Sequence, residues 1–324
     1  MVTITETKFS DIYITGNGKK AYIPDKRTLS ALMEFAPEDL NKFYNTVVQG
    51  WDGQTPSYSI KYNKILYRVE RSETISGAQY CIRRMPESVP SIKVLGYPSE
   101  LVHYLMSLRR STGLILCSGP TGAGKTTTIS SLMKEFLIKE GGFSYTIEDP
   151  AEQPLDGIYQ AECGGLGLCK QTTPINGNWG ESLKSALRSN PRYIMVGEIR
   201  TPDAASEVLR AATSGHLVFS TIHANNVVDA INSVVKYASS GDMSEELAYD
   251  LFSRGILGII HQTLVGKGIK KPQVSFLFAN PNTFMGDQVR GIIKTGKLNL
   301  GTSIETQMTR LAKGLSLFPE NDYE

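Results

Sequence analysis

Residues 119 to 126 form the stretch of this sequence that is best suited to chemistry. They are Gly-Pro-Thr-Gly-Ala-Gly-Lys-Thr, which fits the phosphate-binding pattern Gly-x-x-x-x-Gly-Lys-Ser/Thr in full. Glycines let such a loop point its backbone N–H groups at phosphate oxygens, and a following helix adds the positive end of its dipole. Lys125 is expected to reach the β- and γ-phosphates of a nucleotide, and the Thr126 hydroxyl to ligate Mg²⁺. The alternative is a glycine turn that binds no ligand.

The elements on either side of this loop favour the phosphate-binding interpretation. The apolar run 114–117 predicts a buried parallel strand before it. After it, apolar residues between 129 and 137 recur at helical spacing, and Gly141-Gly142 ends the predicted helix. The residues expected to contact the nucleotide are Pro120, Thr121, Gly122, Ala123, Gly124, Lys125, Thr126 and Thr127.

Polar residues also stand at the ends of three further predicted strands. These strands are residues 143–147, 193–196 and 217–221. The first leads into Glu148, Asp149 and Glu152, the second into Glu198 and Arg200, and the third is bracketed by His216 and His223. Because ligands of open α/β sheets bind outside the carboxyl ends of the strands, we expect these side chains to gather where the loop holds the phosphates. Taken singly, such acidic residues can be helix caps, and such histidines can be structural hydrogen-bonding groups.

Glu198 is the carboxylate that we expect to act in catalysis, because it follows an apolar strand. It could hold Mg²⁺ through water or polarise the attacking water. Glu152 is the alternative for the second role, and the sequence leaves that choice open. The catalytic candidates are therefore Glu198, Glu152, Lys125, His223 and His216, with Thr126 and Glu198 as the metal-binding candidates.

Composition limits the classes of protein that this chain could represent. It has 324 residues, of which 40% are hydrophobic and 20% charged, as in a soluble globular protein with two domains. Its net charge of +2 provides no basic excess for binding nucleic acid. No apolar run approaches the roughly 20 residues of a membrane span, and residues 1–10 lack the apolar stretch of a signal peptide. We therefore expect a cytoplasmic protein whose thiols are free, although Cys163 and Cys169 leave a disulfide or metal site open.

The hydrophobic pattern divides the chain into a small domain, a linker and a large domain. Residues 1–90 predict an α+β domain, with strands at 10–14 and 65–69 and helices at 29–35 and 40–48. Residues 91–100 fall in a proline-bearing linker. From 101 to 324, strands and helices alternate as in a parallel sheet covered on both faces, and the chain is expected to be mostly helical after about residue 242.

Four stretches, in order, resemble the motifs of the secretion ATPase family of type IV pilus and type II/type IV secretion motors, including the pilus retraction ATPases. Residues 119–126, 146–152, 196–200 and 213–225 match its Walker A motif, Asp box, Walker B motif and His box. The resemblance extends to the segment near residues 10–11 and to residues 68–86, which are similar to the family's N-terminal domain. Residues 262–264 and the tail through Met308 are similar to its C-terminal helices. It implies an α/β fold with a RecA-like P-loop ATPase core, a mainly parallel sheet, a PAS-like N-terminal domain and C-terminal helices.

The resemblance also implies a function and a set of partners. The function would be Mg²⁺-dependent ATP hydrolysis by a homohexamer that acts on an inner-membrane platform protein from the cytoplasmic face of a bacterial inner membrane. Membrane contact would come only through partners, with no direct contact to nucleic acid. Glu148 and Asp149 would contact the nucleotide, and N-terminal arginines would reach its γ-phosphate, the candidates being Arg68, Arg71 and Arg83, with Arg84 as a neighbour. Without the resemblance, these arginines would be taken for surface residues.

Some stretches depart from the family's pattern. Residues 188–192 lack the acidic residues that often flank the proline there, Thr201 stands where an Asp is common, and 163–180 is longer and richer in glycine. Residues 288–293 match the retraction motif only loosely, so extension, retraction and secretion all stay open. Two other functions also stay open, a ring-shaped nucleic-acid translocase and a scaffold that binds ATP with almost no hydrolysis.

Overall fold

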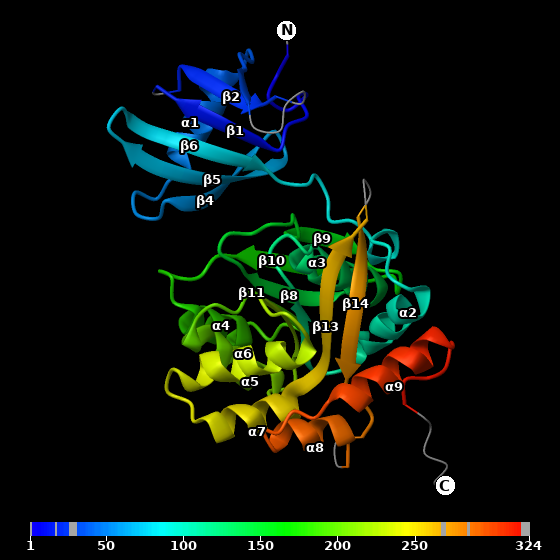
Figure 1. Ribbon diagram of the computed structural model, residues 1–324. Coiled ribbons are helices and arrows are strands. Elements are labelled where there is room, and N and C mark those ends of the chain that lie inside the picture. The colour runs from blue at the N-terminus through cyan, green and yellow to red at the C-terminus, as the bar shows by residue number, and fades with distance from the viewer. Residues whose placement is uncertain (1, 17, 26–30, 267–269, 284–285, 319–324) are drawn as a thin grey trace. The chain divides into compact units, whose positions relative to one another are not determined.

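The computed structural model describes residues 2–16, 18–25, 31–266, 270–283 and 286–318 (Figure 1). The chain forms two compact units. Unit 1 contains Met1–Val89 together with Asp149–Pro154, and unit 2 contains Pro90–Glu148 together with Leu155–Glu324. Among the described residues, no helix has both the length and the apolar character needed to cross a membrane.

Unit 1 is built on an antiparallel sheet of six strands in the order β3-β2-β1-β6-β5-β4. The strands are β1 Asp11–Thr15, β2 Lys20–Pro24, β3 Leu32–Glu34, β4 Ser57–Tyr62, β5 Ile65–Thr74 and β6 Gly77–Arg84, and the helix is α1 Leu40–Gln49. The strands alternate buried and exposed residues because one face packs on α1. Phe43 of α1 contacts the rings of Tyr62 and Tyr67 edge to face at the centre of this core.

One helix that the sequence predicted in this unit is wrong where the structure describes it. Residues 32–34 of the predicted helix 29–35 form β3, which pairs antiparallel with β2. Residues 29 and 30 lie outside the described residues. The three residues of β3 are all exposed, so their apolar spacing did not mark a buried helix face. Backbone pairing with β2 decides the conformation here.

Unit 2 contains an eight-stranded sheet in the order β14-β13-β7-β12-β11-β8-β10-β9. Its strands are β7 Gly113–Ser118, β8 Gly142–Ile147, β9 Gly157–Gln160, β10 Leu166–Thr172, β11 Tyr193–Glu198, β12 Leu217–Ile222, β13 Ile256–Val265 and β14 Lys271–Phe278. The strands from β13 to β10 are parallel, whereas β14 and β9 pair antiparallel at the two edges. The prediction of an α/β fold with a mainly parallel sheet is therefore confirmed.

Helices cover both faces of this sheet (Figure 1). They are α2 Ser99–Ser107, α3 Lys125–Glu140, α4 Trp179–Arg188, α5 Pro202–Ala212, α6 Val227–Ser239, α7 Glu245–Gly255, α8 Gln288–Lys294 and α9 Gly301–Ala312, with short 3₁₀ turns η1 Ile92–Val94 and η2 Leu108–Arg110. Helices α4 to α8 share one apolar cluster with the sheet. On the other face, Phe136 of α3 packs against the rings of Tyr193 and Phe219. Thr201 caps α5 as predicted, accepting a hydrogen bond from the Ala204 backbone N–H.

The prediction that the chain is mostly helical after residue 242 is wrong for β13 and β14. Residues 262–264, which resemble the start of the family's C-terminal helices, lie on β13. This strand extends the sheet beside β7, and seven of its ten residues are buried. Gly258 allows close pairing with β14, because a Cβ atom there would lie 2.2 Å from Cδ1 of Phe278. The glycine-rich stretch after Cys163 likewise contains a strand, β10.

Candidate nucleotide-binding site

The loop from Gly119 to Gly124 joins the carboxyl end of β7 to the start of α3. The three glycines of this loop, Gly119, Gly122 and Gly124, have φ angles of 148°, 75° and 83°. A Cβ atom on Gly119 would lie only 2.2 Å from the carbonyl oxygen of Gln262. Gly119 therefore combines a backbone angle that side chains disfavour with a close approach to β13. The strand–loop–helix arrangement predicted from the sequence is present.

Lys125 holds its ammonium group over this loop. Its side chain is 9% exposed, and Nζ donates to the carbonyl oxygens of Gly119 at 2.9 Å and Pro120 at 3.1 Å. Nζ also lies 3.9 Å from Oε1 of Glu198. A nearly buried ammonium group needs such partners, because desolvation is otherwise unfavourable. The cation that would meet phosphate oxygens is thus fixed at the mouth of the loop.

Glu198 ends β11 and is the carboxylate that meets Lys125. Its side chain is 23% exposed, and its second oxygen forms an ion pair with Arg200. The parallel pairing of β11 with β12, and of β12 with β7, brings the carboxyl end of β11 to the same sheet edge as the loop. The carboxylate therefore lies between two cations and keeps access to solvent.

Glu148 follows the neighbouring strand β8 and is almost fully buried. Oε1 of its carboxylate accepts hydrogen bonds from Oγ1 of Thr146 and Nε2 of Gln171, each at 2.8 Å. Glu148 also packs against β11: a Cβ atom placed on Gly197 of that strand would lie 3.4 Å from Cγ of Glu148. Glu148 is thus held within the sheet edge by two neutral donors.

The two predicted catalytic histidines lie at opposite ends of β12. His223 follows the carboxyl end of this strand, where Ile222 pairs with Ser118 just before the loop. His216 precedes the amino end, and its Nδ1 lies 2.7 Å from the carbonyl oxygen of Pro191. The seven residue steps from His216 to His223, at about 3.3 Å each, separate the two by about 23 Å. The expectation that both histidines stand beside the phosphates therefore fails for His216, since it precedes the strand whose far end meets the loop.

Gln262 is a residue of this site that the sequence analysis missed. It lies on β13 and is 1% exposed. Its side-chain Nε2 donates to the carbonyl oxygen of Ala123 at 2.5 Å, inside the loop. Its Oε1 accepts from Thr128 Oγ1 at 3.0 Å, from Cys117 Sγ at 3.2 Å and from the Tyr97 hydroxyl. One amide thus joins β13, β7, the loop and the first turn of α3.

The signal that could have identified Gln262 is a long polar side chain within an apolar run. Residues 256–260 are apolar apart from Gly258, and the amide stands two residues beyond them. A buried amide must find partners for both its donors and its acceptor. Recognising the run as a strand beside β7 would have directed those partners to the loop. Because residues after about 242 were predicted to be mostly helical, the partners of the Gln262 amide were not sought in the loop.

Thr126 has the properties required of an Mg²⁺ ligand. It lies in the first turn of α3 beside Lys125 and is partly exposed, and its hydroxyl has no protein hydrogen-bond partner among the described residues. Within the same described ranges, no group of three or more His, Cys, Asp or Glu side chains could hold a metal ion by itself. A single hydroxyl beside a phosphate-binding loop fits Mg²⁺ that takes most of its ligands from phosphate and water.

All four cysteines are free thiols.

Arg68 and Arg83 lie opposite each other on β5 and β6 in unit 1. Both alternate with buried residues, so both side chains lie on the face away from the unit 1 core. Arg68 Nη1 is 3.7 Å from Oε1 of Glu152, and Arg83 Nε donates to Oδ1 of Asp11 at 2.9 Å. Like charges directly opposite each other repel, and here each arginine has its own carboxylate. Asp149 and Glu152 belong to the segment that groups with this unit.

The other two arginines near them have structural partners. The Arg71 guanidinium lies 3.7 Å from the centre of the Trp51 ring and also pairs with Glu73. Arg84 donates to the carbonyl oxygens of Thr5 and Thr7. Their contacts hold loops of unit 1 in place. Arg68 and Arg83 are therefore the pair whose charges are displayed on the open face of the sheet.

Comparison with known proteins identifies relatives for most of the chain. The model of the family described as type II/IV secretion system protein matches residues 52–295. A twitching motility protein of Neisseria gonorrhoeae is 29% identical over 75% of this chain and 61% of its own length. The type IV pilus assembly ATPase PilB of Pseudomonas aeruginosa is 32% identical over 57% of this chain and 31% of its own length. The chain thus spans less than two thirds of these curated relatives.

Solved structures agree with this result over nearly the whole chain. The pilus retraction motor PilT with bound ADP has a TM-score of 0.69 at 26% identity, covering 98% of this chain and 91% of its own. The ATPase DotB of Legionella pneumophila has a TM-score of 0.68 and covers 95% of this chain and 88% of its own. Its identity of 19% makes it a likeness of fold. The resemblance seen in the four sequence motifs is confirmed.

Proposed function

This chain belongs to the type II/IV secretion system protein family, and we propose that it is an ATP-hydrolysing motor that powers type IV pilus dynamics or type II/IV secretion. The observation that carries the proposal is the contact of Lys125 with both the loop carbonyls and Glu198. It brings a phosphate-binding cation and a carboxylate together at one sheet edge. This is the pair of charges that phosphoryl transfer to water requires. The ADP bound to the similarly folded retraction motor supports ATP as the nucleotide.

The residues proposed to bind ATP are those of the loop and its surroundings. Backbone N–H groups between Pro120 and Thr127 would hold the phosphates at the N-terminus of α3. Glu148, Asp149, Arg68 and Arg83 remain proposed contacts from the family resemblance. Thr126 would ligate Mg²⁺ directly, and Glu198 would do so through water. The metal ion would neutralise charge on the β- and γ-phosphates.

Glu198 is the proposed residue that orients and polarises the attacking water. Its partial exposure admits water, and its ion pair with Arg200 holds the carboxylate in place. Lys125 would stabilise negative charge that develops on the γ-phosphate oxygens. His223 lies at the same sheet edge and is proposed to contribute a hydrogen bond there. Glu152, paired with Arg68 in unit 1, is the second proposed carboxylate.

The proposal for the whole protein extends these roles to an assembly. The domains would be a PAS-like N-terminal domain at 1–90, a linker at 91–100 and an ATPase domain at 101–324. A homohexamer would couple neighbouring sites, because head-to-tail contacts that close make rings. It would act on an inner-membrane platform protein from the cytoplasmic face of a bacterial membrane. The names of the relatives, a twitching motility protein and a type IV pilus assembly ATPase, support a role in a pilus system.

Steady-state ATP hydrolysis tests the proposal. We expect the purified protein to hydrolyse ATP with Mg²⁺, and Lys125→Ala to lower kcat by about 100-fold or more. Lys184→Ala, an exposed lysine on α4, is the matched control and should leave turnover unchanged. Light scattering with nucleotide should give the mass of a hexamer. ADP binding without hydrolysis in the unmodified protein would contradict the motor and favour a nucleotide-binding scaffold.

A further inference from the structure

A cleft of about 540 Å³ lies beside α2 and α3 in unit 2, away from the loop residues described above. We call it the α2–α3 cleft. It is lined by Lys93, Tyr97, Ser99, Val102, His103, Met106, Arg109 and Lys139. Its volume falls within the range of small-molecule sites, about 300–1,000 Å³. None of the motifs of the nucleotide-binding site contributes a residue to it.

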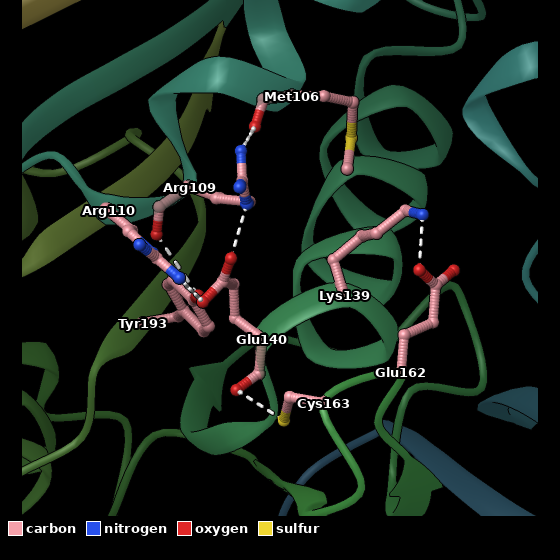
Figure 2. A network of polar contacts seen from close by, with 8 residues as sticks. All are labelled: Met106, Arg109, Arg110, Lys139, Glu140, Glu162, Cys163 and Tyr193. Atoms are coloured by element: carbon pink, nitrogen blue, oxygen red, sulfur yellow. Dashed lines mark hydrogen bonds and ion pairs between the residues drawn. The ribbon is translucent and has the colours of Figure 1, made fainter.

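The cationic side chains among the residues that line this cleft favour an anion. Of its lining residues, all within the described part of the chain, none carries a carboxylate, whereas Lys93, Arg109 and Lys139 are cationic. Lys93 is exposed and has no ion pair among the described residues. Lys139 pairs with Glu162 at the rim (Figure 2).

Arg109 keeps a net positive charge beside the cleft even though it is paired. Its Nε donates to Glu140 at 2.5 Å, and its Nη1 donates to the carbonyl oxygen of Met106 at 3.1 Å (Figure 2). Glu140 also receives two hydrogen bonds from Arg110. Two guanidinium groups therefore share one carboxylate, which leaves one positive charge uncompensated. An oxyanion near Arg109 would compensate it.

The remaining wall of the cleft is apolar. Val102 and Tyr97 are almost buried, and Met106 is half-buried beside them. An unbranched thioether adapts to different shapes, and an aromatic ring offers a flat contact surface. Basic groups at the rim and an apolar wall together match a ligand with an acidic head and an apolar body.

We propose that the α2–α3 cleft binds a small amphipathic anion, with an aromatic or aliphatic body and a phosphate or carboxylate head, and that this ligand changes the affinity of the phosphate-binding loop for nucleotide. The first part stands on the cleft alone. The second part rests on the proposed function of the loop as a nucleotide site.

Tyr97 provides the physical connection between the cleft and the loop. Its ring lines the cleft, and its hydroxyl lies 2.7 Å from Thr128 Oγ1 and donates to Oε1 of Gln262. Gln262 in turn holds the Ala123 carbonyl. A ligand that moves the Tyr97 ring must change the hydrogen bonds of Gln262, because all partners of this amide are buried together. Nucleotide binding must then change ligand affinity by the same factor.

Calorimetry with 1-naphthyl phosphate tests binding to the cleft. The titration is made with excess ADP and Mg²⁺, so that the probe's phosphate does not compete for the loop. We expect the full chain to bind the probe, and 1-naphthol and inorganic phosphate alone to bind at least about tenfold more weakly. Met106→Glu and Lys93→Gln should each weaken probe binding by about tenfold. Lys184→Gln, an exposed lysine outside the cleft, is the matched control.

Two outcomes of this titration would overturn the site. One is that the unmodified protein binds no probe. The other is that Lys184→Gln weakens binding as much as Lys93→Gln, which would reveal nonspecific attraction to surface charge. Failure of ADP to bind would count against the proposed nucleotide site, whereas weaker probe binding in Met106→Glu and Lys93→Gln would still locate the probe in the cleft.

Tyr97→Phe tests the connection to the loop. The phenyl ring still lines the cleft, but the hydrogen bonds to Thr128 and Gln262 are lost. We expect the probe to change the Kd of the unmodified protein for ADP by about three- to tenfold, within the usual range of coupling between sites. In Tyr97→Phe, the probe should still bind while this change disappears. Coupling that persists in Tyr97→Phe, or is absent from the unmodified protein, would overturn the connection.

Discussion

At the scale of single residues, the nucleotide site depends on side chains that serve several partners at once. Lys125 contacts two carbonyl oxygens and Glu198, and Gln262 contacts a carbonyl, a thiol and two hydroxyls. Removing such a side chain leaves several buried polar groups without partners. For each substitution at these positions, the changes in ADP affinity, kcat and free energy of unfolding can therefore be compared. The quantity that changes most identifies the role of the side chain.

The first prediction separates the two candidate carboxylates. Glu198→Gln keeps the shape of the side chain but removes the charge that would polarise water, so kcat should fall by about 100-fold or more. ADP affinity should change much less, because the loop contacts remain. Glu152→Gln should lower kcat by a smaller factor. Steady-state kinetics with ADP titrations decide the matter, and a greater loss of turnover in Glu152→Gln would exchange the two roles.

The second prediction concerns Gln262. Replacement by leucine removes the donor to Ala123 and the acceptor for the Tyr97 and Thr128 hydroxyls, all of them buried. We expect the free energy of unfolding to fall by about 1–3 kcal/mol and ADP binding to weaken about tenfold. Gln273→Leu, at an exposed position on β14, is the control and should alter neither quantity. Urea unfolding and ADP titration measure both, and unchanged ADP affinity in Gln262→Leu would refute the role in positioning the loop.

At the scale of elements, the carboxyl ends of parallel strands bring distant residues together. The strand before the loop, α3 and the strands ending near Glu148, Glu198 and His223 were predictable, because apolar runs and helical spacing mark them clearly. The sequence order also shows that His216 precedes β12 and His223 follows it, which places His216 at the edge of the sheet opposite the loop. The prediction put both histidines beside the phosphates because they lie in one motif.

Other elements could not be recognised from local pattern. The exposed strand β3 has no buried face, so pairing with β2 alone defines it. In β13, an apolar run is compatible with either a buried helix or a buried strand, and contacts distant in sequence decide between them. Gln262 was missed for that reason, since its partners lie on elements more than 130 residues away. The positions of Arg68 and Arg83 opposite each other likewise require the register of β5 and β6.

The third prediction concerns the end of α3. Hydrogen bonds from Arg109, and then from Arg110, hold the pKa of Glu140 below its usual range. A carboxyl whose pKa is lowered by folding stabilises the folded state above its unfolded pKa, and this contribution disappears as pH falls through the folded pKa. Glu140→Gln should therefore lower the free energy of unfolding near pH 7 by at most about 1 kcal/mol. Urea unfolding should show this difference shrinking below pH 4.5, the ordinary pKa of the group, and a constant difference down to pH 3 would refute the assignment.

At the scale of the whole molecule, each unit has its own hydrophobic core. Phe43 lies in the cluster of unit 1 and Phe219 in the sheet of unit 2, and both side chains are fully buried. Separate cores allow separate cooperative unfolding, because each cluster of apolar side chains can lose its packing on its own. Each unit then has its own free energy of unfolding.

The fourth prediction follows from these two cores. Phe43→Ala should destabilise unit 1 by about 3–5 kcal/mol, and Phe219→Ala should do the same to unit 2. Calorimetry should show two unfolding transitions, with a different one shifted in each variant. ATP turnover measured below both transitions should survive better in Phe43→Ala than in Phe219→Ala, whose ring contacts Phe136 of α3. A single transition shifted equally by both substitutions would contradict two cores that unfold separately.

The position of β13 beside β7 has a consequence for synthesis on the ribosome. Gln262 and Ala123 are 139 residues apart, yet the amide of the first holds the loop of the second. At about 5–20 residues per second, the loop emerges several seconds or more before the strand that supports it. A nascent chain that ends before Gln262 leaves β7 without its neighbouring strand β13, and such an open strand edge can pair with other chains. Chains truncated before Gln262 should therefore aggregate more readily than chains that include β13.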